Sequence, residues 1–295
     1  MATKKTNRDF YQDVTNQIIE ALEQGIKPWS CPWDMTQSSG IPSNFDTGKE
    51  YQGMNIMLLW MSAQMNRFSS SQWLTFKQAK SLGGQVRKGE KGTHIFFYKQ
   101  VEKKSKDLKD EKETYAMLKT YVVFNLDQID GIDSKNNMEN VVRDDVTLVD
   151  EVECFIDSLG AKISYSGQKA FYRPSTDEVV IPERQRFHST DDLYATIMHE
   201  LTHWTGHSTR LDRDNKGKFG SKDYAFEELI AELGAAFLMA DFGFIGKVQH
   251  ESYIASWLEV LKNDKRYIFK AAAQASKAHQ YLKALVEQDT CLKAA

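Results

Sequence analysis

Apolar side chains recur at helical spacing near the start of the chain. Residues 8–26 carry Phe10, Val14, Ile18 and Leu22 close to a period of 3.6 residues, which predicts an amphipathic helix. The patterns that follow predict a second helix, a strand that runs into a short helix, and the two strands of a hairpin: residues 53–66, 73–80, 93–101 and 115–125.

In the C-terminal half, short apolar runs come before longer helical patterns. The predicted elements are a helix, three strands, a helix after Ser189 and further helices: residues 147–159, 162–165, 169–174, 178–182, 190–204, 226–240 and one or two within 250–288. Residues 131–146 are polar and weakly periodic, so we expect them to link a domain of residues 1–130 to one of residues 147–295. Because both halves mix helices with strands, the sequence predicts an α+β fold.

Composition and charge exclude several classes of protein. Hydrophobic residues make up 41% of the 295 positions and charged residues 27%, as in ordinary globular domains. No apolar run reaches the roughly 18–20 residues that span a bilayer, so no membrane partner is expected. The net charge of −3 is too small for a protein that imitates DNA along its length.

The first residues and the cysteines indicate a cytoplasmic protein. The basic start of the chain is followed by no apolar signal core, so secretion is not expected. Cys31, Cys154 and Cys291 lie far apart and form no C-x-x-C pair, so neither a disulfide framework nor a cysteine zinc site is indicated. Reduced thiols in a cytoplasm are the expected state.

The candidate chemistry centres on the pattern H-E-x-x-H in the helix after Ser189. His199 and His203 are four residues apart, so on a helix they lie on one face and can bind one metal ion. Glu200 would sit beside that ion and act as a general base toward a water molecule. The expected cofactor is one divalent ion, zinc in the first place, with manganese as the alternative.

A catalytic zinc usually has three protein ligands, and the chain offers several candidates for the third. Thr209 occupies the position where a metzincin has its third histidine, so that version of the motif is excluded. The favoured ligand is Glu228 in the sequence EELIAE at residues 227–232, with Glu227 as second choice and His207 as a weaker one. Glu232, one turn beyond Glu228, is predicted to fix a liganding imidazole through a hydrogen bond.

Other residues are candidates for substrate contacts. A hydrolytic site needs a donor for the developing oxyanion, and His207, Tyr194 and Tyr224 are the candidates. In the N-terminal half a glycine-punctuated basic loop at residues 83–92 predicts phosphate contacts, for which the candidates are Lys77, Arg87, Lys88 and Lys91. Trp29, Trp33 and Trp73 are candidates for stacking on unpaired bases, although tryptophans more often belong to a core.

Particular stretches of both halves carry a family resemblance. They are HELTHWTGH at 199–207, RLDR at 210–213, FGSKDYAFEELIAELG at 219–234, IKPW at 26–29, YQGMN at 51–55, WLTFKQA at 73–79, VRKGEKG at 86–92 and VFNLDQ at 123–128. In these stretches the chain resembles ArdC-like antirestriction proteins over nearly its whole length. The resemblance implies an N-terminal domain that binds single-stranded DNA and a C-terminal zincin-like, gluzincin-type metallopeptidase domain.

The resemblance also implies a function and a ligand set. It implies a plasmid or mobile-element protein that protects incoming DNA from host restriction enzymes, with the metal held by His199, His203 and Glu228. Its partners would be single-stranded DNA and a protein substrate, which the restriction machinery of the host could supply. Two alternatives stay open: a DNA-binding protection protein whose metal site is structural, and a metallopeptidase whose N-terminal half binds protein.

Overall fold

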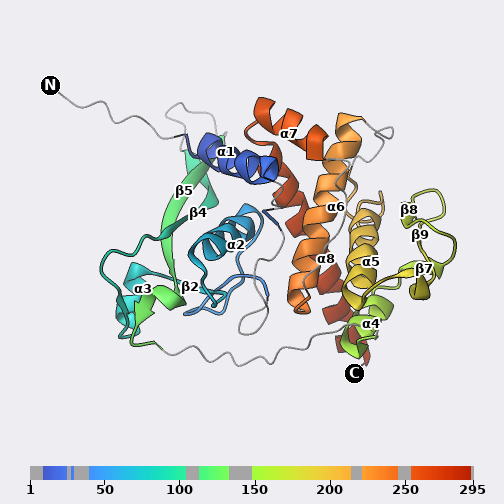
Figure 1. Cartoon of the computed structure of the whole chain (residues 1–295), viewed down its shortest axis with the longest axis horizontal. Helices are drawn as coiled ribbons and strands as arrows, with labels where there is room; N and C mark the ends of the chain where they lie inside the picture. The colour runs from blue at the N-terminus through green and yellow to red at the C-terminus, as the bar shows by residue number, and fades with distance from the viewer. Residues whose placement is uncertain are drawn as a thin grey trace.

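The computed structural model of the chain describes residues 9–24, 28–29, 40–103, 113–132, 148–213, 221–244 and 254–293. Two groups of strands lie at opposite ends, and helices α6 (Lys222–Asp241) and α8 (Tyr267–Lys293) lie between them (Figure 1). Helices and strands occur in both halves, which confirms the predicted α+β class.

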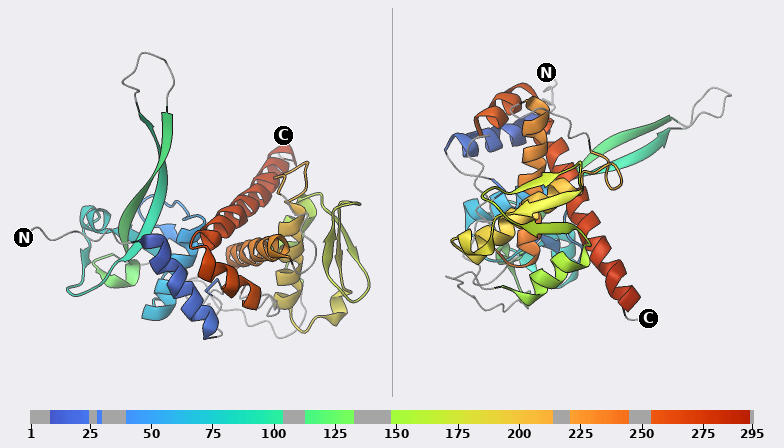
Figure 2. Two further views of the ribbon diagram at one scale, coloured as in Figure 1. Left: turned by 90° about the horizontal axis from the view of Figure 1, so that it is seen from above. Right: turned by 90° about the vertical axis from the view of Figure 1, so that its right-hand side faces the viewer.

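The N-terminal half is built on a four-stranded sheet in the order β1-β2-β5-β4. Strands β1 (Ser43–Asn44) and β2 (Gln72–Thr75) run parallel, and β5 (Glu113–Asn125) pairs antiparallel with β2 and with β4 (Thr93–Lys103). The predicted hairpin is therefore β4 and β5, which together extend away from the rest of the chain (Figure 2).

Short helices and strands complete this half. They are α1 (Phe10–Glu23), α2 (Met54–Asn66), α3 (Phe76–Ser81), β3 (Gln85–Val86), a 3-10 turn (Leu126–Gln128) and β6 (Ile129–Asp130). Helix α1 begins at Asp9, whose carboxylate accepts a hydrogen bond from Gln12 N, and α3 begins with a capping box of Thr75 and Gln78. The two-residue strands were not predicted, because two residues are too few to show a period of two.

The C-terminal half combines helices with a three-stranded sheet. Helix α4 (Asp150–Ser158) is followed by β7 (Lys162–Tyr165), β8 (Phe171–Arg173), β9 (Glu178–Ile181) and a 3-10 turn (Arg184–Arg186). The sheet order is β7-β9-β8, so β8 is an edge strand. Helix α5 (Thr190–Trp204) follows the sheet, and α7 (Ile254–Asn263) follows α6.

The largest apolar core takes side chains from both halves of the chain. Trp60 on α2 packs against Phe237 on α6 with ring centroids 5.8 Å apart, and Trp29 packs against Trp257 on α7 at 5.6 Å. The N-terminal and C-terminal halves therefore share one core, although their sheets are separate.

Two further predictions concern the linker and membranes. Of the predicted linker 131–146, only residues 131 and 132 lie among the described residues. Among the described helices, none is long and apolar enough to cross a membrane.

Candidate metal centre

Helix α5 places both predicted histidines on one buried face. The helix begins at Ser189, whose hydroxyl oxygen accepts a hydrogen bond from Asp192 N at 3.1 Å. His199 and Glu200 are 2% and 6% exposed, and His203 lies one turn further along. The Nε2 atoms of His199 and His203 are 3.2 Å apart, so the spacing in the sequence does bring both rings to one point.

Helix α6 brings a carboxylate to the same point. Its N-cap is Ser221, and buried Glu228 lies in its second turn. Glu228 Oε2 is 3.5 Å from His199 Nε2, and Glu228 Oε1 is 3.6 Å from His203 Nε2. Within the described part of the chain, these three residues form the one group of His, Cys, Asp and Glu side chains arranged to hold a metal ion.

The geometry of this triad fits a divalent ion. Two ligand atoms bound to one tetrahedral ion at about 2.0–2.1 Å lie roughly 3.3 Å apart. The two Nε2 atoms are 3.2 Å apart, and each lies 3.5–3.6 Å from one of the two Glu228 oxygens, while one ligand atom from each residue lies within 4.8 Å of the others. Three protein ligands would leave a fourth position open, as in catalytic rather than structural zinc sites.

A glycine allows the two helices to approach closely enough for this geometry. A Cβ atom at Gly234 on α6 would lie 2.5 Å from Cγ2 and 2.7 Å from Oγ1 of Thr202 on α5. Any larger residue would therefore push α5 and α6 apart beside the triad.

Glu227 holds the ring of His203 from the side away from the triad. Its Oε1 is 3.2 Å from His203 Nδ1, and its two oxygens accept hydrogen bonds from Arg213 Nη2 at 2.7 Å and Arg213 Nε at 3.1 Å. Arg213 also donates to the carbonyl of Thr202 and to the hydroxyl of Thr205. Glu227 is therefore bonded to His203 and Arg213 and is not part of the group arranged to hold an ion, and Arg213 was not predicted from the sequence.

The buried charges of this cluster shift the pKa values of His203 and Glu228. Burial by itself lowers the pKa of His203, but the hydrogen bond and charge of Glu227, with the charges of Glu200 and Glu228, raise it to about 9. Burial raises the pKa of Glu228, yet the hydrogen bond with His199 and the charges of both imidazoles lower it to about 2. Without an ion the cluster therefore favours an anionic Glu228 and a protonated His203, and a metal ion that binds there would displace the proton from His203.

The triad opens into a cavity of about 370 Å³. Its walls are the edge strand β8 and the helices α5 and α6. Glu200 and Tyr224 line it beside the three candidate ligands. The Tyr224 hydroxyl hydrogen-bonds to Glu228. Glu200 therefore faces the same space as the ligands, which is the placement that a general base requires.

The other two predicted oxyanion donors, His207 and Tyr194, lie outside this cavity. His207 is beyond the end of α5, is absent from the cavity lining, and places its Nδ1 2.8 Å from Thr209 Oγ1. Tyr194 is fully buried, and its hydroxyl accepts from Val149 N and donates to Glu153. Of the three oxyanion candidates, the structure brings Tyr224 alone to the cavity.

Glu232 is buried at 2% exposure one turn beyond Glu228. The carboxylate that contacts the Nδ1 atom of His203 is that of Glu227, the residue before Glu228. The predicted hydrogen bond between Glu232 and a liganding imidazole stays a prediction.

The basic residues of the N-terminal half differ in their surroundings. Arg87 donates to Glu90 at 3.0 Å and to the carbonyl of Asp127 at 2.5 Å, and lies 3.5 Å from Asp130. Its guanidinium joins the basic loop to the end of the sheet while the side chain stays 44% exposed, so its contact with phosphates stays a prediction. Lys77, Lys88 and Lys91 are exposed, and their contact with phosphates stays a prediction.

The tryptophan predictions require a correction. Trp29 and Trp73 are 2% and 0% exposed, so neither ring offers a face to a base. Trp29 packs on Trp257, and Trp73 packs edge-on against Phe68, so both belong to apolar cores. Trp33 lies outside the described residues.

Two family models match separate parts of the chain. Residues 8–124 match the N-terminal domain of the anti-restriction factor ArdC, and residues 150–274 match a zincin-like metallopeptidase model. The two matches leave residues 125–149 between them.

Curated relatives align along almost all of the chain. A DNA primase TraC of Escherichia coli is 38% identical over 300 residues, which cover 95% of this chain and 20% of the primase. This chain thus spans about a fifth of the length of that relative. An uncharacterized protein, y4eC of Sinorhizobium fredii, is 38% identical over 291 residues, which cover 96% of this chain and 94% of that protein.

Solved structures show the same arrangement. The metal-free crystal structure of the antirestriction protein ArdC from plasmid R388 matches with a TM-score of 0.83 at 39% identity, covering 95% of this chain and 99% of ArdC. Its Mn(II)-bound structure matches with a TM-score of 0.79 at 40% identity, covering 95% and 98%. The chain therefore belongs to the ArdC family of antirestriction proteins, with an ArdC N-terminal domain and a zincin-like metallopeptidase domain.

Proposed function

We propose that this chain protects incoming DNA from restriction in the recipient cytoplasm by binding single-stranded DNA and hydrolysing a protein at its metal centre. The proposed protein hydrolysis is supported by the triad of His199, His203 and Glu228, which has Glu200 beside it in one cavity. The proposed protection of DNA is supported by the similarity to antirestriction proteins.

The proposed reaction is hydrolysis of a peptide bond. A divalent ion at the triad supplies Lewis acidity and makes a nearby water molecule more acidic. The Glu200 carboxylate takes a proton from the attacking water and then delivers it to the leaving nitrogen of the substrate. The Tyr224 hydroxyl, which lines the cavity, donates a hydrogen bond to the oxygen that gains negative charge.

The edge strand β8 offers a place for the substrate chain. It pairs with β9 on one side, and its residues Phe171 and Tyr172 line the cavity of the triad. An extended peptide that added to this edge would place its carbonyl groups next to the metal centre. The substrate class is therefore an extended protein segment.

The identity of the ion is part of the proposal. A zincin-like fold and an Mn(II)-bound relative support a divalent metal, and the nitrogen-rich ligand set favours zinc. Element analysis of the purified chain tests this assignment. We expect about one zinc per chain, and its loss in His199→Ala and Glu228→Ala variants.

DNA binding is tested on the full chain, because the two halves share a core. We expect affinity for a fluorescent single-stranded oligonucleotide to fall with salt, and Lys88→Gln and Lys91→Gln each to reduce the slope by about 0.7 for every phosphate that the lysine neutralises. Lys222→Gln is the control, because Lys222 is also exposed but lies at the start of α6, in the other half of the chain. Absence of salt-dependent binding would favour the alternative in which the N-terminal half binds protein.

A further inference from the structure

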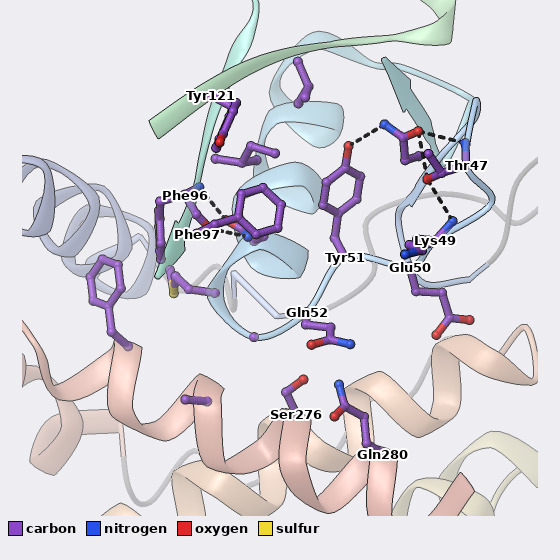
Figure 3. A pocket seen from close by; sticks show the side chains of 18 of the residues that line it. Thr47, Lys49, Glu50, Tyr51, Gln52, Phe96, Phe97, Tyr121, Ser276 and Gln280 are labelled. Atoms are coloured by element: carbon purple, nitrogen blue, oxygen red, sulfur yellow. Dashed lines mark hydrogen bonds between the residues drawn. The ribbon is translucent and has the colours of Figure 1, made fainter. Parts of the chain in front are cut away.

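A second, larger cavity lies away from the metal centre, between the N-terminal half and helix α8. It has a volume of about 740 Å³ and lies between the sheet, the segment 44–55 and helix α8. Figure 3 shows Phe97 and Tyr121 on the sheet side, Tyr51 near the middle, and Ser276 and Gln280 on the opposite side.

Two aromatic rings at this cavity are exposed, unlike the tryptophans. Phe97 on β4 is 47% exposed and Tyr121 on β5 is 43% exposed, although exposed aromatic rings are unfavourable without a partner. The two rings meet edge to face with centroids 5.5 Å apart, and both line the cavity. Below them, Ile95 and Val123 form an apolar floor.

Side-chain amides line the cavity on the side of the segment 44–55. Asn44 Nδ2 is 3.2 Å from Gln78 Oε1 and 3.4 Å from the Tyr51 hydroxyl, so these groups hold one another in place. Gln52 and Gln280 also line the cavity. The amides of Asn44 and Gln78 are occupied by bonds within the protein, so those of Gln52 and Gln280 supply the donors and acceptors that the edges of unpaired bases require.

The charges at the cavity favour an anionic ligand. Lys49 and Lys277 line it, and among the described residues no carboxylate lies within ion-pair distance of either ammonium. The one carboxylate of the lining, Glu50, is paired with Lys283 at 3.2 Å. Phosphate groups could therefore lie along this side without repulsion from a free carboxylate.

We propose that this cavity binds unpaired bases of single-stranded DNA, with Phe97 and Tyr121 as stacking platforms and Lys49 and Lys277 as phosphate contacts. This inference rests on the proposed binding of single-stranded DNA and assigns that binding to this cavity. Exposed aromatic rings, amide groups and unpaired lysines around one open cavity are the combination found in sites for single strands. In a duplex the faces of the bases are stacked and their Watson–Crick edges are paired, so duplex DNA is a poor ligand for this cavity.

The test compares two oligonucleotides of equal length, one of thymidines and one made mainly of abasic sites, on the full chain. We expect the wild-type chain to prefer the strand with bases, and Phe97→Ala and Tyr121→Ala each to weaken its binding by about 5- to 30-fold. Neither variant should change the affinity for the abasic strand, since the phosphate contacts remain. Phe97→Trp should restore the preference for bases, because it restores a stacking surface.

Phe76→Ala is the matched control, because Phe76 is a 56% exposed aromatic residue of the same half that does not line the cavity. Lys277→Gln should lower the salt slope, whereas Lys270→Gln on the same helix, which is paired with Asp264, should not. Thermal unfolding of each variant reports whether it is folded.

The outcomes separate the two proposals. If the wild-type chain binds neither strand, the proposed DNA binding fails. If it binds both strands equally, or if Phe76→Ala weakens binding as much as folded Phe97→Ala and Tyr121→Ala do, the cavity is not the base site and the inference is overturned.

Discussion

Glu227 accepts from His203 on one side and from Arg213 on the other, so it fixes the ring that faces the metal. Carboxylates in this position typically contribute 10- to 100-fold to metal affinity. We therefore expect Glu227→Gln to weaken zinc binding by about that factor while the chain stays folded. A competition titration with a chromophoric chelator measures it, and Glu259→Gln on α7 is the control because the Glu259 side chain is 67% exposed; equal affinities for both variants would contradict this role.

Asp177 and Arg210 tie the turn between β8 and β9 to the end of α5. Arg210 pairs with Asp177, stacks over Trp204 and donates to the Trp204 carbonyl. The hydrogen bond from Arg210 is the main cause that lowers the pKa of Asp177 below 3.8. Because the folded pKa is lowered, the stabilisation is present above the unfolded pKa and is lost as pH falls through the folded value.

This sign gives a pH prediction. Asp177→Asn should lower the melting temperature at pH 7, and the difference from wild type should shrink as the pH falls toward 3. Thermal unfolding followed by circular dichroism at several pH values measures it. A difference that stays constant or grows toward pH 3 would mean that the ionised carboxylate does not stabilise this end of the helix.

The ligands themselves could be predicted from sequence, whereas the residues that orient them could not. His199 and His203 depend on spacing within one helix, which the sequence displays directly. The choice between Glu227 and Glu232 as the orienting carboxylate depends on how α6 is rotated against α5, which is a property of packing. The stacking role predicted for Trp29 and Trp73 was wrong for a related reason, since residue type does not reveal burial.

The contact between α5 and α6 depends on Gly234. We expect Gly234→Ala to cost about 1–3 kcal/mol of stability through overpacking, and to weaken metal binding because the helices that carry the ligands move apart. Thermal unfolding and the chelator titration measure the two effects.

A second substitution, at Thr202, tests whether the added methyl group of Gly234→Ala acts through its contact with this side chain. Removing Cγ2 and Oγ1 by Thr202→Ala should restore part of the affinity in the double variant, because these are the nearest atoms to the added methyl group. Strictly additive losses in the double variant would show that the two residues do not act through this contact.

At the level of helices and strands, the α-helices and the strands of three or more residues were predicted, whereas the two-residue strands were not. The H-E-x-x-H helix and the β4–β5 hairpin follow their patterns closely. Strands β1, β3 and β6 consist of two residues each, so their pairing depends on neighbours that are distant in sequence.

The two halves of the chain are expected to unfold together, because Trp60 of α2 packs on Phe237 of α6 in a shared core. Trp60→Ala should lower the free energy of unfolding by about 3–5 kcal/mol and shift a single transition seen by calorimetry. Met65→Ala on the same helix is the control, because Met65 is 80% exposed. Two separate transitions, of which Trp60→Ala shifts one, would show that the halves are independent.

The shared core could not be predicted from the sequence. Each half shows its own periodic elements, and the polar stretch 131–146 has the composition of a linker. The apolar faces of α1, α2, α7 and α8 have no partner marked in the sequence, and the pairing of α1 with α7 follows from tertiary packing alone.

The central claim is that chemistry at the metal centre protects the incoming DNA. The direct measurement is transfer of an unmodified plasmid that encodes the wild-type or the Glu200→Gln chain into a restricting and a non-restricting host. Glu200 is not a ligand, so we expect the variant to keep its metal ion and its affinity for single-stranded DNA but to lose protection in the restricting host. Full protection by a metal-loaded Glu200→Gln chain would contradict the account and favour a structural metal site in a DNA-binding protection protein.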